Sequence, residues 1–332
     1  MRNAHESAVA EHRRIAGRTA SGAANARRGP DPRPAARVAP LSGATRVAAV
    51  FGDPVEHSLS PAMHNAAYAA MRIDRVYVAF HVTPPMLAAA VGALPALGIA
   101  GINLTVPHKE RALRMVAKLS AEAQMLGAIN CIVNRPGGLF GDNTDARGLE
   151  RDLLSLGVTL KNARAIIIGA GGAAAAALVA CLRLGARDLA VANRTPARAR
   201  ALARRLRTRL PRALHGAEIS AHPLDALANP ALLARAALII NATPMGLTQS
   251  GFARLDYART PRGCFFYDLV YAPEPTPFLR PAIALGRSNA DGAGMLVNQG
   301  ELAFKLFNGV APPRGVMRRA LWQRLGRDTG SG

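Results

Sequence analysis

Acidic residues, cysteines, aromatic residues and long hydrophobic runs are all scarce in this sequence, and each shortage excludes a class of protein. No apolar stretch approaches the roughly 20 residues that cross a bilayer, because arginines follow soon after the Ala-rich stretch 172–180. Cys131, Cys181 and Cys264 lack the spacing of metal ligands, so we expect reduced packing residues of a cytoplasmic protein. The sequence therefore predicts no membrane partner and no metal centre.

The charge of the chain is strongly unbalanced. It has 42 Lys and Arg against 21 Asp and Glu, which gives a formal net charge of +21. Such a chain can attract nucleic acid, but it has only five Tyr and one Trp, and aromatic residues do not alternate with basic ones. The densest arginine cluster, 198–209, is spread over one predicted helix. We therefore expect small anionic ligands and no nucleic-acid partner.

Residues 1–45 are predicted to form a disordered basic tail. They are rich in Gly, Pro, Ala and Arg, with almost no β-branched or aromatic residues, so they cannot bury enough apolar surface to fold. A transit peptide is also Arg-rich, but this segment lacks an apolar core and carries Glu6, Glu11 and Asp31. An extension without a function is the simpler interpretation.

From Arg46 the sequence predicts strands and helices in alternation. Hydrophobic runs indicate strands at 47–51, 76–80, 102–106 and 129–133. Helix-forming segments separate them at 63–71, 85–97 and 109–125. A polar loop at 141–145 precedes a helix over about 146–156. This alternation predicts an α/β fold.

Lys109 lies just beyond the third of these strands. Pro107 has no N–H to donate, so it must end the ladder of hydrogen bonds. Strand ends in α/β folds open onto crevices that bind ligands, and a lysine placed there is a candidate proton donor. Taken alone, Lys109 would more simply begin a solvated helix.

A glycine motif opens a second α/β segment. The buried-strand pattern 164–168 runs into Gly169-Ala170-Gly171-Gly172-Ala173-Ala174, which fits G-x-G-x-x-A and is followed by an Ala-rich helix. Strand, glycine turn and helix in this order are typical of a dinucleotide site, where the backbone approaches a pyrophosphate at the helix N-terminus. Further strands are predicted at 189–192, 237–240 and 264–270.

The end of the strand 189–192 predicts which dinucleotide binds. An acidic residue there would hydrogen-bond the ribose 2′-hydroxyl of NAD, but the chain has Asn193-Arg194-Thr195. The planar guanidinium of Arg194 suits a 2′-phosphate, and Arg198 is a candidate helper one helical turn further on. We therefore predict NADP rather than NAD.

From about residue 46 to its last helix, the chain resembles the shikimate dehydrogenase family. The motifs that carry the resemblance lie at 52–61 with His64-Asn65, and at 103–109, 127–130, 143–145, 169–172, 193–195, 241–246 and 291–300. The resemblance implies NADPH-dependent, reversible reduction of 3-dehydroshikimate to shikimate, a step of aromatic amino-acid (chorismate) biosynthesis.

The resemblance also implies two domains with the active site in the cleft between them. Residues 46–145 would form the substrate-binding domain, completed by C-terminal helices at 292–327. Residues 146–291 would form a doubly wound, Rossmann-type domain for NADP. Either a monomer or a homodimer is compatible with the sequence.

By resemblance, Lys109 and Asp145 are the catalytic pair. When hydride reaches the substrate carbonyl carbon, the oxygen becomes an alkoxide, and a lysine can donate the proton while a carboxylate orients the lysine. Asp145 would keep Lys109 protonated by Coulomb attraction. Asp145 also precedes a predicted helix, which permits a second role as its N-cap.

The other site residues follow by position in the motifs. Those matched to substrate contacts are Ser58, Ser60, Thr105, Asn130, Tyr271 and Gln299. In an extended segment, the i, i+2 spacing of the two serines would place both hydroxyls on one face, toward a carboxylate. Those expected to contact the cofactor are Gly169, Ala170, Gly171, Gly172, Ala173, Asn193, Arg194, Thr195, Arg198, Thr243, Met245, Leu269, Gly292 and Met295.

One cysteine and three histidines also lie in or next to the motifs. Cys131 stands where the family commonly has Thr, which loosens the expected hydrogen bonding of its loop but spares Asn130. His57, His64 and His108 fit no zinc template, so we expect them to make structural hydrogen bonds.

Three alternatives stay open. A quinate/shikimate dehydrogenase would differ in the room for one more hydroxyl group beside the two serines and Tyr271. An aminoshikimate-type paralogue would share the motifs. A non-catalytic protein that senses NADP or shikimate is disfavoured by the intact Lys109 and Asp145.

Overall fold

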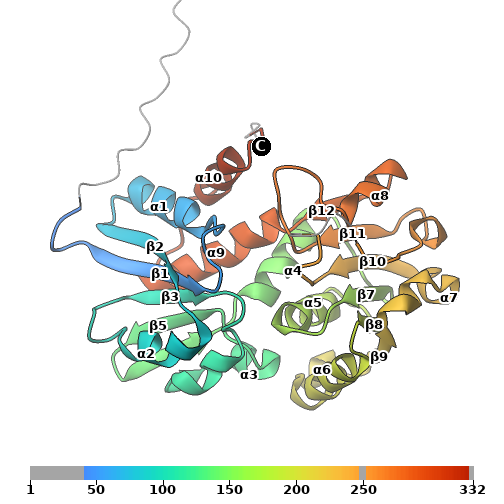
Figure 1. Ribbon diagram of the computed structural model, residues 1–332, viewed down its shortest axis with the longest axis horizontal. Helices are drawn as coiled ribbons and strands as arrows, with labels where there is room; N and C mark the ends of the chain where they lie inside the picture. Colours follow the sequence, from blue (N-terminus) through green and yellow to red (C-terminus); the bar gives the residue numbers. More distant parts are fainter. Residues whose placement is uncertain (1–40, 247–251, 329–332) are drawn as a thin grey trace, which may run out of the picture. The chain divides into compact units, whose positions relative to one another are not determined.

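The computed structural model describes residues 41–246 and 252–328, so most of the predicted tail lies outside the described residues. The described chain forms two six-stranded sheets (Figure 1). The strands of the first sheet run in the order β2-β1-β3-β5-β6-β4. Their bounds are β1 Arg46–Gly52, β2 Arg75–His81, β3 Gly101–Leu104, β4 Lys118–Leu119, β5 Cys131–Arg135 and β6 Gly138–Asp142.

The first sheet is mixed rather than fully parallel. β1 pairs in parallel with β2 and β3, whereas β5 is antiparallel to both β3 and β6. The sequence pattern does not predict β4 and β6, because β4 has only two residues and β6 contains Gly138 and Gly141, which weaken the strand pattern. The predicted α/β class is confirmed.

The second sheet has the order β12-β11-β10-β7-β8-β9, and all of its pairs are parallel. This is the doubly wound order predicted for a dinucleotide-binding domain, with its reversal of strand order between β7 and β10. The strand bounds are β7 Arg164–Ile168, β8 Asp188–Asn193, β9 Glu218–Pro223, β10 Ala236–Asn241, β11 Phe265–Asp268 and β12 Asn289–Asp291.

Helices cover both faces of each sheet (Figure 1). On the first sheet, α1, α9 and α10 share one apolar cluster with Val50, while α2 packs with Phe51 on the other face. On the second sheet, α4, α5 and α6 share a cluster with Ile167, while α7 and α8 share one with Ile166. The helix bounds are α1 Ser60–Met71, α2 Leu87–Gly92, α3 Ala121–Leu126, α4 Asp145–Ser155, α5 Gly172–Arg183, α6 Pro196–Arg209, α7 Pro230–Leu233, α8 Leu279–Ala284, α9 Ala293–Asn308 and α10 Val316–Arg324. Short 3-10 turns lie at η1 Pro84–Met86, η2 Arg111–Met115, η3 Arg212–Leu214, η4 Leu224–Ala228 and η5 Tyr257–Arg259.

The helix predicted over 109–125 is wrong. Lys109 lies in a turn, followed by η2, β4 and α3. The two residues of β4 pair with β6, and the Ser120 hydroxyl then accepts from the Ala123 N–H at 3.1 Å, which starts a separate helix. A distant strand pairing therefore overrides the local helix propensity.

The strand before Lys109 ends earlier than predicted. β3 stops at Leu104, and Val106, expected in a buried strand, is 70% exposed.

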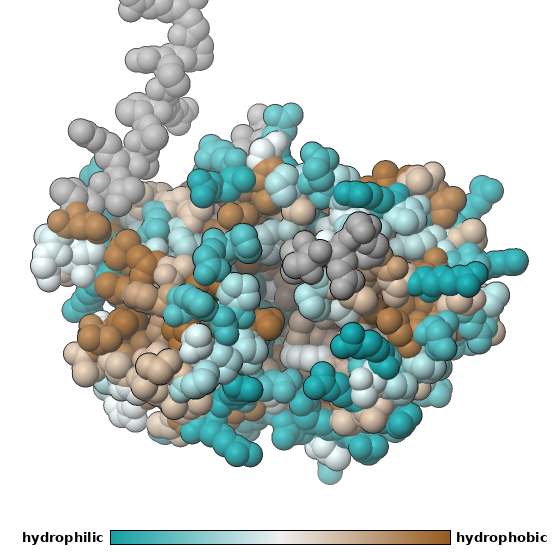
Figure 2. Space-filling view, in the orientation of Figure 1, coloured by the Kyte–Doolittle hydropathy of each residue, from teal (hydrophilic) through white to brown (hydrophobic). Residues whose placement is uncertain are grey.

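Figure 2 shows that hydrophilic and hydrophobic side chains are mixed on the face drawn there, and that this face is hollowed near its centre. Within the described residues, no helix is both long and apolar enough to cross a membrane.

The packing of α4 against α9 requires a glycine at 148. A Cβ atom built on Gly148 would lie 2.7 Å from the Gln299 Cβ and 2.8 Å from its backbone N. Real side chains do not approach so closely, so the two helices can only meet at this separation because position 148 has no side chain. Asp145 and Gln299, both candidate site residues, lie on these two helices.

The substitution Gly148→Ala is expected to destabilise the protein by about 1–3 kcal/mol, because overpacking outweighs the better helix propensity of alanine. Gly92→Ala is the matched control, since Gly92 is also helical and no atom from outside its own stretch of helix lies within 4 Å of the position that its Cβ would take. The control should gain up to about 1 kcal/mol. Urea unfolding of both variants measures the difference, and a Gly148→Ala protein as stable as the control would refute the packing argument.

His64 is a buried imidazole in the first apolar cluster. It stacks on Tyr77 with a centroid separation of 4.1 Å, and both ring nitrogens are buried without a hydrogen-bond partner. The structural hydrogen bond expected for His64 is therefore wrong, because its ring packs among aromatic side chains. Burial lowers the pKa of His64 from 6.5 to about 3.

This pKa predicts the direction of a pH effect on stability. The unfolded chain takes up a proton near pH 6.5, whereas the folded chain does so only near pH 3, so the stability contributed by neutral His64 falls below pH 6.5. From pH 7 to pH 5 the native protein should lose about 2 kcal/mol more of its unfolding free energy than the variant His64→Phe. Denaturant unfolding at both pH values measures this, with exposed His57→Gln as the control. Equal losses in all three proteins would contradict the assignment.

Candidate active site

Lys109 and Asp145 form an ion pair at the centre of the predicted site. The Lys109 Nζ lies 2.7 Å from the Asp145 Oδ2, and their side chains are 22% and 5% exposed. The Lys109 carbonyl accepts from the Ile129 N–H at 2.8 Å, which ties the turn after β3 to the segment before β5. The ammonium group therefore remains accessible while its partner is almost fully enclosed.

Asn130 holds the second oxygen of the carboxylate. Its Nδ2 donates to the Asp145 Oδ1 at 2.7 Å and to the Thr144 Oγ1 at 2.9 Å, and its Oδ1 accepts from the Thr144 N–H at 2.8 Å. Asn130 is 2% exposed. Its amide group thus fixes Asp145 in orientation, and its contact with a substrate stays a prediction.

Asp145 does not cap its helix. It is the first residue of α4, and Thr144 occupies the N-cap position without a side-chain capping bond. The carboxylate instead bonds to Lys109 and Asn130, so the expected N-cap role is wrong. Its negative charge in the first turn still interacts favourably with the helix dipole.

Asn143 belongs to the motif at 143–145 but is not among the site residues predicted from the sequence. Its Oδ1 accepts from the Asp145 N–H at 2.9 Å, and its Nδ2 donates to the Ala128 carbonyl at 2.9 Å. The residue is fully buried. Asn143 therefore shapes the turn that presents Asp145, a role that only its fixed place in the motif could have indicated.

Cys131 keeps a polar contact in place of the family's usual threonine. Its Sγ accepts from the Asn103 Nδ2 at 3.1 Å and lies 3.9 Å from the Thr144 Oγ1. Burial raises the pKa of the Cys131 thiol far above its usual range, so it stays protonated. The sulfur therefore takes part in the buried network that includes Asn103 and Thr144.

The two candidate substrate serines do not lie in an extended segment. Ser60 begins α1 and is 7% exposed, and Leu59 before it has a helical conformation. The Ser60 N–H donates to the Ser58 Oγ at 3.4 Å. The argument that i, i+2 alternation places both hydroxyls on one face is therefore wrong, because the helix starts inside the motif.

Tyr271 and Thr105 each contact the backbone of the segment 51–59. Burial raises the pKa of Tyr271, which an interaction with the Leu59 backbone partly offsets. Tyr271 also packs against the apolar cluster that includes Leu59. The Thr105 N–H donates to the Phe51 carbonyl at 2.9 Å, so Thr105 is fixed at the start of the turn that carries Lys109.

Gln299 approaches the catalytic network from α9. Its Oε1 lies 3.4 Å from both the Asn130 Nδ2 and the Thr144 Oγ1, and its Nε2 donates to the Leu296 carbonyl at 2.9 Å. The structure thus brings Lys109, Asp145, Asn130 and Gln299 together from four separate segments.

The glycine turn has the geometry that a dinucleotide requires. Gly169 has φ +120°, and a Cβ there would lie 2.9 Å from the Ala242 carbonyl oxygen, so only glycine fits. Gly171 is the N-cap of α5, with Gly172 and Ala173 in its first turn and Ala170 just before it. The unpaired N–H groups at this helix start form a cradle for a pyrophosphate.

The glycine turn lies beside the catalytic motif. A Cβ on Gly172 would be 3.5 Å from the Cβ of Ala128, two residues before Asn130. The start of α5, where a dinucleotide is predicted to bind, therefore lies next to the segment that holds Asp145.

The predicted 2′-phosphate site is exposed and positively charged. Arg194 and Arg198 are exposed, and neither belongs to an ion pair among the described residues. The Asn193 Nδ2 donates to the Thr195 carbonyl at 2.9 Å, which folds the turn before α6. Both guanidinium groups are therefore available to an anion.

The remaining cofactor candidates surround a buried polar cluster. The Asn241 Oδ1 accepts from the Thr243 hydroxyl at 2.7 Å, and its Nδ2 donates to the Asp268 Oδ1 at 2.8 Å. The Met245 N–H donates to the Thr243 Oγ1 at 3.3 Å. Burial raises the pKa of Asp268 to about 6, against the hydrogen bonds it accepts. This cluster shapes the loop after β10.

Leu269, Gly292 and Met295 lie at the junction of β11, β12 and α9. The Leu269 N–H donates to the Asn241 carbonyl at 2.9 Å, and a side chain on Gly292 would collide with the Leu269 backbone. Met295 is 9% exposed and packs in the apolar cluster around α5. Met295 therefore offers a ligand little surface.

Metal ligation finds no support in the described residues. No group of three or more His, Cys, Asp or Glu side chains could hold an ion there. The His108 Nε2 bonds to the Val82 carbonyl at 2.7 Å, the structural role expected of it.

Family models match three parts of the chain. Residues 50–132 match a shikimate dehydrogenase substrate binding domain, 152–270 match shikimate / quinate 5-dehydrogenase, and 292–321 match a shikimate 5'-dehydrogenase C-terminal domain. A shikimate dehydrogenase (NADP(+)) of Citrifermentans bemidjiense is 41% identical over 286 residues, which cover 86% of this chain and 97% of that protein.

Solved structures agree with these matches. A shikimate 5-dehydrogenase from Thermus thermophilus, in complex with NADP(H) and shikimate, is 37% identical with a TM-score of 0.73, covering 84% of this chain and 99% of that one. A quinate dehydrogenase from Corynebacterium glutamicum in complex with NAD is 29% identical with a TM-score of 0.76, covering 84% and 99%. The chain belongs to the shikimate dehydrogenase family.

Proposed function

We propose that this protein is an NADP-dependent shikimate dehydrogenase that reversibly reduces 3-dehydroshikimate to shikimate. The observation that carries the proposal is the Lys109–Asp145 pair at 2.7 Å, beside a glycine turn at the start of α5. The names of the relatives agree with this activity and cofactor.

The pair is suited to move one proton at the reacting oxygen. Bound NADPH supplies the hydride that reduces the ring carbonyl. Lys109 donates a proton to the oxygen as negative charge develops on it, and in the reverse direction accepts that proton from the hydroxyl. Asp145 holds the Nζ in place, and Asn130 keeps Asp145 from rotating. Lys109, the more exposed partner, is the one that contacts the substrate.

The substrate carboxylate is proposed to bind near the start of α1. Ser58 and Ser60 flank Leu59, whose backbone interacts with Tyr271, and each of the three residues carries a hydroxyl donor. Thr105 and Gln299 lie on the side of Lys109 and are proposed to bind ring hydroxyls. Two contacts support the assignment of Thr105 and Gln299 to the ring hydroxyls. Thr105 is bonded to Phe51 at the start of the turn that carries Lys109, and the Gln299 Oε1 lies 3.4 Å from the Thr144 Oγ1.

Three further features belong to the proposal. We assign 46–145 with 292–327 to the substrate domain and 146–291 to the NADP domain, because α9 and α10 share a core with β1. We place the enzyme in the cytoplasm, since Cys131, Cys181 and Cys264 are buried free thiols. It acts as a monomer or homodimer.

Quinate oxidation is the second candidate, because the quinate dehydrogenase shares the fold closely. Arg194 favours NADP as the cofactor and therefore favours the shikimate dehydrogenase activity. With no acidic residue at the end of β8, the chain lacks the usual acceptor for the ribose 2′-hydroxyl of NAD.

The proposal predicts that the protein reduces NADP+ with shikimate and is much slower with quinate or with NAD+. Absorbance at the NADPH band measures all four pairs of substrate and cofactor. Comparable rates with quinate and NAD+ would assign the protein to the quinate branch, and no reduction by folded protein would reject dehydrogenase activity.

The same assay tests Arg194 with a matched control. Arg194→Gln should raise the KM for NADP+ about 10–100-fold, because a charge-assisted hydrogen bond to phosphate is worth about 1.5–3 kcal/mol. Arg200→Gln, an exposed arginine further along α6, should change it little. Equal effects of both substitutions would show a general attraction rather than a phosphate contact.

Replacement of Lys109 by Ala should lower kcat by about 10²–10⁴-fold, the usual contribution of a positioned acid or base. Shikimate binding, measured by calorimetry on the same protein, should weaken much less. An unchanged kcat would reject Lys109 as the proton donor.

A further inference from the structure

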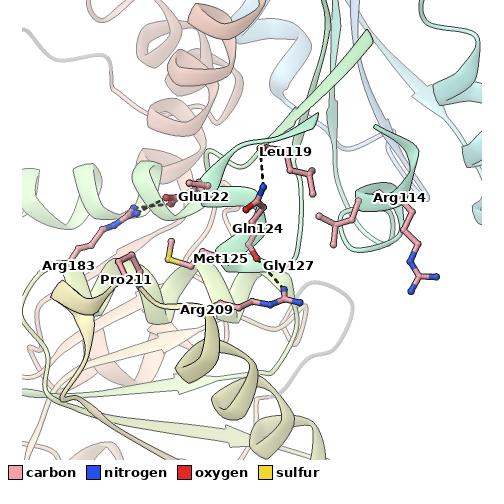
Figure 3. Close-up of a pocket in the computed structure, with 11 residues that line it drawn as sticks. Arg114, Leu119, Glu122, Gln124, Met125, Gly127, Arg183, Arg209 and Pro211 are labelled. Carbon is pink, nitrogen blue, oxygen red and sulfur yellow. Dashed lines mark hydrogen bonds and ion pairs between the residues drawn. The ribbon is translucent and has the colours of Figure 1, made fainter. Parts of the chain in front are cut away.

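A cavity separate from the candidate active site lies between α3 and the C-terminal ends of α5 and α6. Its volume is about 840 Å³. Figure 3 shows the side chains that line it. They are Leu113, Arg114, Leu119, Ala121, Glu122, Gln124, Met125, Gly127, Arg183, Arg209 and Pro211.

The walls come from two different parts of the fold. Residues of η2, β4 and α3 form one wall, and the C-terminal ends of α5 and α6 form the other. The glycine turn is at the opposite end of α5 from Arg183, about 16 Å along the helix axis. None of the candidate catalytic, substrate or cofactor residues lines the cavity.

One acidic side chain of the cavity is already neutralised. Glu122 accepts two hydrogen bonds from Arg183, at 2.9 and 2.5 Å, and Glu150 lies 3.6 Å from the same guanidinium. The charges of Glu122 and Arg183 therefore cancel within the protein. This ion pair joins α3 to α5, and the other charged side chains of the lining determine the net charge of the cavity.

Two arginines of the lining have no acidic partner among the described residues. Arg209 donates from one nitrogen to the Gln124 carbonyl at 3.2 Å, and Arg114 is exposed and forms no ion pair there. Figure 3 shows Arg114 on the far side of the cavity from Arg183. The cavity thus carries an uncompensated positive charge.

Arg209 lies beside Gly127 at the cavity edge. Gly127 ends α3 with φ +65°, and a Cβ there would lie 2.6 Å from the Arg209 Nη1. The hydrogen bond from Arg209 to the Gln124 carbonyl brings the guanidinium to the end of α3.

The rest of the lining is mainly apolar. Leu113, Leu119, Met125 and Pro211 supply hydrophobic contacts. Pockets of this size with a few charged groups are typical of small-molecule sites. A phosphate dianion would meet the carbonyl ends of α3, α5 and α6, whose dipoles repel a double negative charge more strongly than a single one. A single negative charge on an apolar body suits the lining better.

We propose that this cavity binds a small organic monoanion, a carboxylate carried on an apolar ring or chain. Its carboxylate is attracted by Arg114 and Arg209, and its apolar body contacts Leu113, Leu119 and Met125. Such a ligand bridges α3 to the ends of α5 and α6. The site is separate from the catalytic pair and binds independently of it.

The test uses 1-naphthoate as the probe, titrated calorimetrically into the full chain with and without saturating NADP+ and shikimate. Binding should persist in both conditions, and neutral 1-naphthamide should bind at least about tenfold more weakly. Arg114→Gln and Ala121→Phe should each weaken naphthoate binding about tenfold or more, by removing charge and by filling the cavity. Exposed Arg111→Gln, on the same turn but outside the lining, is the control and should change nothing.

Four results would overturn the proposal. Absence of naphthoate binding would reject the site, and displacement by NADP+ with shikimate would place the probe in the active site. Equal weakening by Arg111→Gln would indicate general attraction to a basic surface. Competition by inorganic phosphate at equal concentration would reject the preference for a monoanion. Shikimate oxidation by each variant without probe confirms that it is folded.

Discussion

The ion pair between Lys109 and Asp145 is the interaction on which the arrangement of this molecule depends. Neither residue is placed by its own segment alone. Lys109 lies in a turn whose backbone is held by Ile129, and Asp145 is oriented by Asn130 and Asn143. A carboxylate that is 5% exposed costs free energy unless it is paired, so the loops must stay close for the site to persist.

Helix α4 transmits this constraint to both sheets. It begins with Asp145, meets α9 at Gly148, and accepts a hydrogen bond at Asp152 from the Tyr267 hydroxyl of β11, at 2.7 Å. Burial raises the pKa of Asp152, and this hydrogen bond offsets part of that cost. One helix therefore contributes to the catalytic pair, packs in the core of the second sheet with Tyr267, and meets α9, which packs on the first sheet. A shift of α4 would disturb all three together.

The sequence predicted those parts of the fold that depend on local patterns. The strand at 164–168 matches β7 in both bounds, and the predicted glycine turn and helix follow it. The predictions over 109–125 and at Ser58 and Ser60 failed where distant contacts decide the structure. Pairing of Lys118 with β6 breaks the expected helix, and the start of α1 takes Ser60 out of an extended conformation. No local pattern contains that information.

The excess of arginine also acquires a structural explanation. Helix α6 carries arginines along its length, and none of them forms an ion pair among the described residues. Arg198 lies in its first turn, beside the proposed 2′-phosphate site. Arg209 lies in its last turn and lines the cavity between α3 and the ends of α5 and α6. The helix dipole favours an anion at the first end and opposes one at the second. The carbonyl groups at the C-terminal end of α6 therefore oppose the attraction of Arg209 for an anion, whereas no such groups face Arg198. We expect the cavity beside Arg209 to bind only a singly charged ligand, and more weakly.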